Sequence, residues 1–405
     1  MIFQIPSLPQ QYVDVIATID ELRDKLRFAI SDNLNRWYGF LARMSYARVI
    51  YASNTMEGVA ATLDDAVAVV DGEQHPNDDQ KKEDWQALIG HRDAMDYIIQ
   101  LSKEAHFRHN EGTLLGLHFM MMKHDLSKNP GRYRPGAIHV TNAATHRIVY
   151  ESPDVDIVPG LMGELIDVLN AKSSAHSLVR AAMAHLNLTM IHPFRDGNGR
   201  MARALQTFVL AREGILDPRF SSIEEYVGTN SLEYYDVLAR VGQGSWRPDN
   251  DALPWIRFCL KAHYYQARTL MRRMVESGHL WEALEKEIER RKIPSRTMNA
   301  LMDAATGRRI RNTLYRKDAE ISSQVAKRDL RTLVDQGLLT PHGERRGRTY
   351  VASDYLAQLW RAMRIDTRIE DPFGERPAST SSKPASAPVG IGPVRLSYQQ
   401  VIKGS

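Results

Sequence analysis

The stretch that decides the fold covers residues 192–203 and reads HPFRDGNGRMAR. It lies between two predicted helices, over Ser174–Met190 and Arg200–Arg212, so it forms a loop that opens a helix. Two glycines flank Asn198 and allow successive backbone N–H groups to point outward as an anion-binding nest. The helix N-terminus adds partial positive charge. The sequence therefore predicts a phosphate-binding site here.

Charged side chains of the same stretch can supply phosphate chemistry. Arg200 and Arg203 share one helical face and can both reach phosphate oxygens. Asp196 offers a carboxylate to a hard cation such as Mg²⁺, and His192 can accept a proton near neutral pH. A base, a metal ligand, a glycine nest and two arginines in one short run are hard to obtain as an ordinary turn.

Length and composition limit the fold classes that the whole chain can adopt. The 405 residues predict two or three domains, because single hydrophobic cores stop growing at about 250 to 300 residues. Contents of 43% hydrophobic and 25% charged residues exclude wholesale disorder, collagen and disulfide scaffolds. There is no apolar run of membrane-spanning length and no signal-peptide pattern, so we expect a cytoplasmic protein without a membrane partner. Cys259, the one cysteine, lies in an apolar helical run and is expected in the core.

The fold class predicted from apolar periodicity is mainly α. An Asn-Pro-Gly break at residues 129–131 precedes two short strands, 138–140 and 147–150, which predict a β-hairpin on the helical body. A further helix is predicted over Leu280–Arg291, after the helical body. A winged helix is predicted from three helices, Met298–Ala304, Ile310–Arg316 and Ser323–Gln336, and two strands, Leu338–Thr340 and Thr349–Val351.

The expected domain order has five parts. They are a helical region 1–110 with a motif at 53–58, a core 111–265, connecting helices 266–292, the winged helix-turn-helix domain 293–365 and a tail 366–405. The tail is predicted to be disordered, because it has too few large apolar side chains to offset the entropy of ordering.

The string at 192–203 matches every fixed position of the signature HPFx[DE]GN[GK]RxxR, and about residues 1–265 resemble the Fic family. The resemblance implies a helical-core enzyme that transfers AMP from ATP to a hydroxyl side chain of a target protein, with ATP and Mg²⁺ as cofactors. His192 would be the base and Asp196 the Mg²⁺ ligand, with Phe194 as the anchor of the loop. The implied ATP contacts of the loop are Asp196, Gly197, Asn198, Gly199, Arg200, Met201, Ala202 and Arg203.

Two further segments carry the resemblance. The hairpin resembles the family's flap, which aligns the target segment by strand addition, and its strand Arg147, Ile148, Val149 and Tyr150 would meet target and nucleotide. Tyr234 and Tyr235 resemble a tyrosine pair near the adenine, although they also suit a helix core. Gly242 stands where some relatives have Asn, which leaves the adenine contacts and the nucleotide preference open.

Residues 53–58, SNTMEG, match the family's inhibitory motif [ST]xxxE[GN], in front of the core. Ser53 and Glu57 are one helical turn apart and are expected to face the same way. A carboxylate paired with Arg203 would take the place of the γ-phosphate. The resemblance thus implies an autoinhibited protein adenylyltransferase acting on Ser, Thr or Tyr hydroxyls, its own included.

Other functions stay open at this point. Glu57 could instead position water for the removal of AMP, and the chain could be a DNA-binding regulator whose Fic domain senses nucleotide. Lys327, Arg328 and Arg331 fall on one face of the candidate recognition helix, as in a major-groove reader. Winged helices also dock proteins and form dimers, so DNA, a protein partner and a homodimer remain open.

Overall fold

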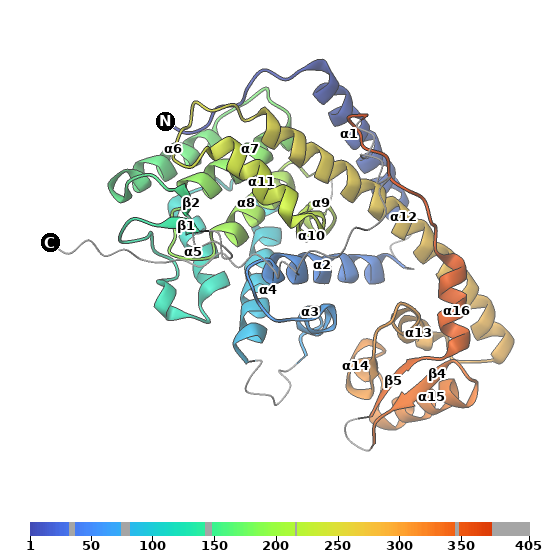
Figure 1. Ribbon diagram of the computed structural model, residues 1–405. Coiled ribbons are helices and arrows are strands. Elements are labelled where there is room, and N and C mark those ends of the chain that lie inside the picture. The colour runs from blue at the N-terminus through green and yellow to red at the C-terminus, as the bar shows by residue number, and fades with distance from the viewer. Residues whose placement is uncertain (32–36, 74–81, 142–147, 215–216, 345–347, 375–405) are drawn as a thin grey trace, which may run out of the picture.

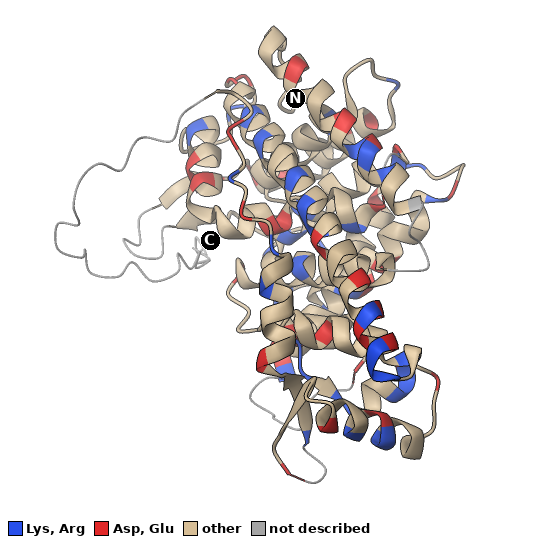
Figure 2. Cartoon of the chain, turned by 90° about the vertical axis from the view of Figure 1, so that its right-hand side faces the viewer, with Lys and Arg blue, Asp and Glu red and all other residues tan. Residues whose placement is uncertain are grey.

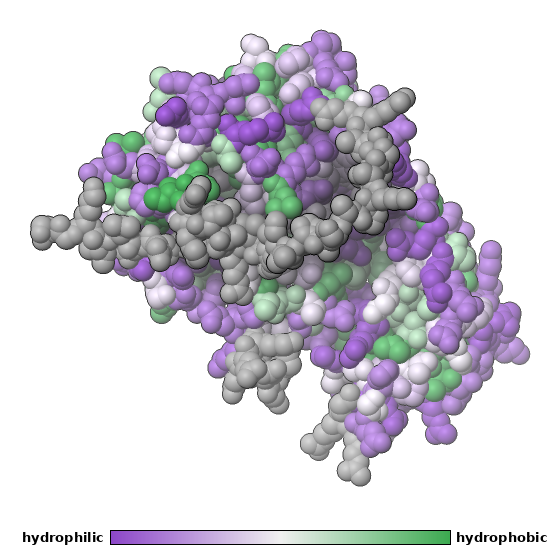
Figure 3. Space-filling model, viewed as in Figure 1, coloured by the Kyte–Doolittle hydropathy of each residue, from purple (hydrophilic) through white to green (hydrophobic). Residues whose placement is uncertain are grey.

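The computed structural model describes residues 1–31, 37–73, 82–141, 148–214, 217–344 and 348–374. The described chain is mainly helical with two small antiparallel sheets, so the predicted fold class is confirmed (Figure 1). No described helix combines the length and the apolar character that crossing a membrane requires. The face seen in Figure 3 is mostly hydrophilic, with small apolar patches.

The N-terminal body is a helical assembly around two central helices, α7 and α8. Both helices bury residues all round, which places them inside the core. They begin at Ser177 and Asn198, a few residues from the predicted starts. The helices of this body are α1 (Gln10–Ser31), α2 (Tyr38–Thr55), α3 (Leu63–Val70), α4 (Lys82–Ser102), α5 (Glu111–Met122), α6 (Val158–Asn170), α7 (Ser177–Ile191), α8 (Asn198–Arg212), α9 (Pro218–Ser221), α10 (Glu224–Thr229) and α11 (Ser231–Gly242).

The predicted hairpin is confirmed as β1 (His139–Thr141) and β2 (Ile148–Glu151), which pair antiparallel with Val140 opposite Tyr150. Tyr150 points inward, and its hydroxyl donates to the Met190 carbonyl over 2.8 Å. Its neighbours Ile148 and Val149 are exposed. Arg147 lies outside the described residues.

One continuous helix, α12 (Leu253–Arg291), leads from the body to the C-terminal module (Figure 1). It crosses the boundary expected at 265/266, where separate helices had been predicted. The helix continues because Leu270, Leu280, Leu284 and Ile288 keep one apolar face buried, and a single glycine, Gly278, does not break it. Cys259 is buried in this helix, as expected.

The C-terminal module contains α13 (Met298–Ala305), β3 (Ile310–Arg311), α14 (Asn312–Asp318), α15 (Ser323–Asp335), β4 (Leu339–His342), β5 (Thr349–Ala352) and α16 (Asp354–Met363). Its sheet has the order β3-β5-β4. The predicted helix Ile310–Arg316 is wrong at its start, because Ile310 and Arg311 pair with β5 as a strand. That pairing is a long-range contact, which local periodicity does not report.

The module shares a hydrophobic cluster with the body. Leu26, Leu41 and Phe220 belong to the same buried cluster as Leu301 and Leu330. Ion pairs reinforce the contact. They join Arg43 to Asp303, Arg308 to Asp71, and Arg311 to Glu73.

Residues 365–374 contradict the predicted disorder of 366–405. They form an extended strap that returns along α12 to the body (Figure 1). The Ile365 N–H donates to Glu276 over 2.9 Å, and Phe373 is buried between the Tyr12 ring and the Arg257 guanidinium. One aromatic anchor therefore orders a segment of polar composition. The rest of the predicted tail, 375–405, lies outside the described residues.

Candidate active site

Two residues with left-handed backbone conformation fix the loop between α7 and α8. His192, which ends α7, has φ +52°, and Gly197, which precedes α8, has φ +78°. Asn198 closes the loop, since its side chain accepts from the Phe194 N–H over 2.9 Å and donates to the Phe194 carbonyl over 2.8 Å. Phe194 is fully buried and anchors the loop in the core, as the resemblance implies.

The His192 ring is held ready to accept a proton. Its Nδ1 lies 3.2 Å from the Thr189 carbonyl, which can only accept, so Nδ1 carries the ring proton and Nε2 keeps its lone pair. Burial lowers the pKa of His192 to about 4. The imidazole is therefore neutral at physiological pH, as a general base must be.

Two residues that sequence reasoning did not assign to the site brace this loop. Arg134 is buried, donates from Nε to the His192 carbonyl over 2.9 Å, and donates from Nη1 to the Gly136 carbonyl over 2.8 Å. His118 stacks on Phe194 with ring centroids 3.8 Å apart and bonds the Asp196 carbonyl over 2.9 Å. Arg134 lies in the sequence between the break at 129–131 and the hairpin, but the inward direction of its side chain depends on tertiary packing.

The start of α8 has the features expected of a phosphate cradle. A Cβ at Gly199 would approach Glu57 Oε1 to 2.4 Å, so only glycine allows this close contact. Arg200 is 4% exposed, and its buried Nε and Nη1 have no hydrogen-bond partner among the described residues. Buried, unmatched cationic donors suit an anionic ligand.

Asp196 lies next to Arg200, with Oδ1 4.0 Å from Arg200 Nη2. Its Oδ1 accepts from the Gly197 N–H over 2.6 Å, and Oδ2 lies 3.6 Å from Lys128 Nζ. Lys128 is a third site residue that sequence reasoning missed, because it follows a different helix, α5. No cluster of three or more metal-ligating side chains occurs within the described residues.

Glu57 and Ser53 both contact Arg203. Arg203 donates from Nη2 to Glu57 over 2.8 Å and from Nε to the Ser53 hydroxyl over 2.9 Å. Ser53 is within α2, whereas Glu57 lies just beyond its last residue, Thr55. Burial alone would lower the pKa of Arg203, but the Glu57 carboxylate, together with Tyr234 and Tyr235, outweighs burial and raises it. The ion pair that the motif suggested is thus present.

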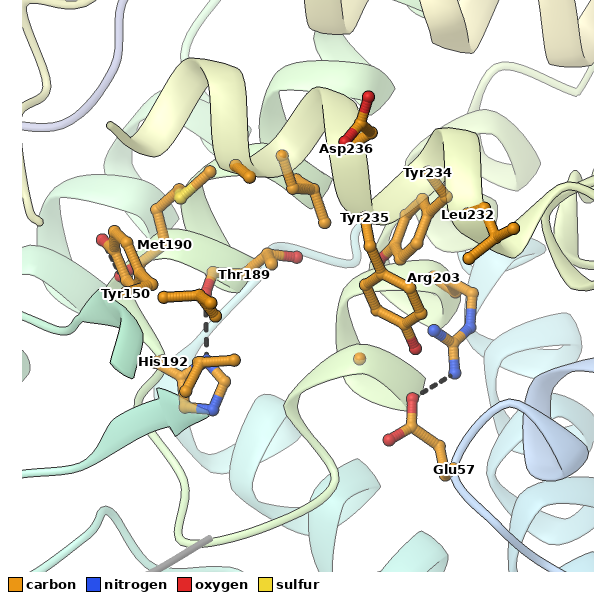
Figure 4. A pocket seen from close by; sticks show the side chains of 15 residues that line it. Glu57, Tyr150, Thr189, Met190, His192, Arg203, Leu232, Tyr234, Tyr235 and Asp236 are labelled. Carbon is orange, nitrogen blue, oxygen red and sulfur yellow. Dashed lines mark hydrogen bonds and ion pairs between the residues drawn. The ribbon is translucent and has the colours of Figure 1, made fainter. Parts of the chain in front are cut away.

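A cavity of about 370 Å³ connects His192 with the Glu57–Arg203 pair, whereas Asp196 and Arg200 do not line it (Figure 4). His192, Gly199, Arg203 and Glu57 line one part of it. A mostly apolar part is lined by Val140, Val149, Tyr150, Met190, Leu232, Tyr234, Tyr235, Leu238 and Ala239. The size and the apolar lining suit a small organic ligand.

The other expected contacts differ in position. Met201 and Ala202 are fully buried on α8 and do not line the cavity. Beside Gly242, the Tyr150 ring fills the space of a side chain, since a Cβ there would lie 3.2 Å from two ring carbons.

Lys327, Arg328 and Arg331 lie on α15 in the C-terminal module and are all exposed, so the structure does not bring them to the cavity. Figure 2 shows basic residues on the helices of this module. Arg331 Nε lies 3.7 Å from Asp335, one turn further along α15.

Residues 108–210 match the family model described as the Fic/DOC family. The chain is 26% identical to protein adenylyltransferase Fic of Nematostella vectensis over 246 residues, 60% of this chain and 54% of that protein. It is 28% identical to protein adenylyltransferase Fic of Drosophila willistoni over 251 residues, 59% of this chain and 47% of that protein. The chain therefore spans about half the length of these curated relatives.

The fold has a counterpart among solved structures. A Fic family protein from Desulfovibrio desulfuricans G20 superposes with a TM-score of 0.56 at 23% identity, covering 87% of this chain and 99% of that chain. The likeness extends over most of the described helices.

Proposed function

We propose, since residues 108–210 match the model of the Fic/DOC family, that this protein is an autoinhibited adenylyltransferase acting on hydroxyl groups of proteins. The observation that carries the proposal is the neutral His192 ring, with its Nε2 lone pair, in one cavity with Arg203 and Gly199. The names of the relatives, protein adenylyltransferase Fic, support it.

The proposed reaction balances around the α-phosphorus of ATP. The target hydroxyl oxygen forms a bond to this phosphorus, and the bond from phosphorus to the oxygen bridging the α- and β-phosphates breaks. Pyrophosphate leaves, and His192 Nε2 takes the hydroxyl proton. The chain's main contribution is to position the reactants and offset their negative charge, which is what phosphoryl chemistry mostly requires.

Mg²⁺ fits the site through Asp196. Among the described residues no backbone donor bonds the second oxygen of Asp196, Oδ2, and hard cations prefer carboxylate oxygens together with phosphates and water. When bound, the ion would offset charge on the α- and β-phosphates. Lys128, 3.6 Å from the same oxygen, would move aside or contact phosphate itself.

Autoinhibition is proposed from the contact of Glu57 with Arg203. A guanidinium that already holds a carboxylate is not available to a γ-phosphate, so ATP would bind out of line for attack. The second candidate activity is removal of AMP, because Glu57 and His192 line one cavity and could position water there.

Partners are proposed at two surfaces, a target protein at the hairpin and DNA at the C-terminal module. The exposed Ile148 and Val149 suit addition of a target strand at β2. The arrangement of helices and sheet in 293–365 supports a winged helix, whose exposed basic face on α15 suits DNA; a homodimer is the alternative use of this module.

Incubation of purified protein with ATP labelled at the α-phosphate, with and without Glu57→Gly, tests the function. Label on protein that increases in the variant supports the transferase, and a mass measurement of the modified peptide identifies the group. Faster loss of AMP with the wild type than with the variant favours the removal activity. No label on the protein or on added protein fractions in either form, despite nucleotide binding, favours a sensor.

A further inference from the structure

Five buried polar side chains form a continuous chain from α1 to the candidate nucleotide cavity. Arg23 Nη2 lies 3.3 Å from His263 Nδ1, and His263 Nε2 lies 3.0 Å from the Gln206 amide. The same amide lies 2.6 Å from His185 Nδ1, and His185 Nε2 lies 3.0 Å from the Tyr234 hydroxyl. All five are at most 4% exposed, and Tyr234 lines the cavity (Figure 4).

Arg23 fixes the direction of the hydrogen bonds. A guanidinium can only donate, so His263 Nδ1 must accept. Burial lowers the pKa of Arg23 to about 10, which leaves it charged at neutral pH, and lowers the pKa of His263 well below its usual range. A neutral imidazole has one N–H, so His263 must donate from Nε2.

The same donor-to-acceptor direction continues from His263 through Gln206 and His185. Gln206 must present its amide oxygen to His263 and its amide nitrogen to His185. The amide nitrogen and oxygen of Gln206 fill nearly the same space, so their placement is assigned from their hydrogen-bond partners, and these partners require the nitrogen to face His185 and not His263. Burial lowers the pKa of His185 to about 3, so this ring is neutral too. It accepts at Nδ1 and donates from Nε2 to the oxygen of Tyr234.

We infer that Arg23, His263, Gln206 and His185 act as positioning residues that make Tyr234 a hydrogen-bond donor to the cavity. With its oxygen accepting from His185, the hydroxyl keeps its hydrogen for an acceptor beside Arg203. A phosphate oxygen of the nucleotide offers such an acceptor in the complex. This inference rests on the proposed function and assigns Tyr234 to the phosphate end of the nucleotide.

The neighbourhood of the hydroxyl agrees with this role. Burial raises the pKa of Tyr234 to about 12, although the nearby Arg203 opposes the rise, so the hydroxyl keeps its proton. Arg203 and Glu57 line the same cavity. A donor placed beside a guanidinium adds a second contact to an anionic ligand.

A single substitution at Gln206 should reverse the donor-to-acceptor direction of these hydrogen bonds. Gln206→Glu keeps the shape but only accepts, so His185 must donate from Nδ1 and then accepts the Tyr234 hydrogen at Nε2. Binding of adenosine 5′-(β,γ-imido)triphosphate, measured by calorimetry at neutral pH, should weaken about tenfold in Gln206→Glu and in Tyr234→Phe, as expected for loss of one bond to a charged group. The double variant should bind no more weakly than Tyr234→Phe alone.

Asn187→Asp is the matched control, since Asn187 is also a buried amide, lies on α7 and bonds the backbone of Phe3 outside the chain. It should keep wild-type affinity. Arg23→Met is a second test, because it removes the guanidinium that sets the direction of the hydrogen bonds. It should weaken binding of the analogue when Tyr234 is present but not when it is combined with Tyr234→Phe.

The outcomes separate the two proposals. Affinity unchanged in Gln206→Glu and Arg23→Met, or losses that add in full to that of Tyr234→Phe, would overturn the inference alone. A wild-type protein that binds no analogue would overturn the proposed function and this inference with it.

Discussion

Glu57 Oε1 accepts a hydrogen bond from Arg203 Nη2 over 2.8 Å, and the two side chains are 10% and 1% exposed. Breaking a buried ion pair of this kind costs about 3 to 5 kcal/mol. The cost is avoided when another anion takes the place of the carboxylate. A nucleotide phosphate is such an anion. The contact therefore sets up a competition between the chain's own carboxylate and the proposed substrate.

Glu57→Gly should raise self-labelling from α-labelled ATP by about ten- to hundredfold, the range that loss of one charge-assisted hydrogen bond allows. Glu57→Gln keeps the size of the side chain and removes its charge, so it should label at an intermediate rate. Equal rates in wild type and Glu57→Gly would rule out autoinhibition by this residue.

His192→Ala should abolish transfer and leave nucleotide affinity within a few fold, because Nε2 acts on the target hydroxyl and not on phosphate. A positioned base contributes about 10²- to 10⁴-fold. Labelling and calorimetry on the same preparation provide the two readouts. In Glu57→Gly the added His192→Ala change should remove the label, and persistence of the label would reject the base assignment.

Asp196→Ala should leave a low activity that no longer responds to Mg²⁺, because the loop loses its carboxylate ligand. Lys128→Met, which removes the ammonium 3.6 Å from Asp196, should lower the Mg²⁺ concentration needed for half-maximal rate. Identical Mg²⁺ titrations for wild type and Asp196→Ala would exclude this ligand.

Stability should fall steeply as the pH drops from about 6.5 toward 4. Burial lowers the pKa of each of six buried histidines, His91, His109, His118, His185, His192 and His263. In this window the unfolded chain binds more protons than the folded one, so each group costs up to about 1.4 kcal/mol per pH unit.

Glu224 has the opposite effect on stability. Burial raises its pKa to about 7, so the stability of its buried, protonated form is lost as the pH rises. One carboxyl does not outweigh six rings. Thermal unfolding at pH 7.5, 6.5, 5.5 and 4.5 measures the slope, which His109→Asn should reduce. A flat profile would contradict the neutral, buried state of these histidines.

Lys327→Glu combined with Arg328→Glu should abolish retention of duplex DNA in a low-salt mobility assay, and wild-type affinity should fall steeply with salt. A matched double reversal of exposed charges on the body, Lys103→Glu with Lys172→Glu, should leave retention unchanged. A wild-type protein that does not shift DNA at low salt would favour protein docking by the module.

The elements that could be predicted from the sequence are those with local causes. The loop at 192–203 and its two helices follow from glycines, an aromatic anchor and helical periodicity. Arg134, His118 and Lys128 could not be found in this way, because their roles arise from backbone carbonyls and carboxylates brought near by tertiary packing. Phe373 shows the same limit, since its partners Tyr12 and Arg257 lie far away in the sequence.

The hydrophobic cluster shared by Leu26, Leu41 and Phe220 with Leu301 and Leu330 makes the two parts of the chain one unit of folding. A truncation after α12 would leave that apolar surface open to water and would release the ion pairs of Arg43 and Asp71. Fragments designed at the apparent domain border would therefore aggregate more readily than the whole chain. For the same reason, exchange of the C-terminal module between related proteins would require matching changes on α1, α2 and α9.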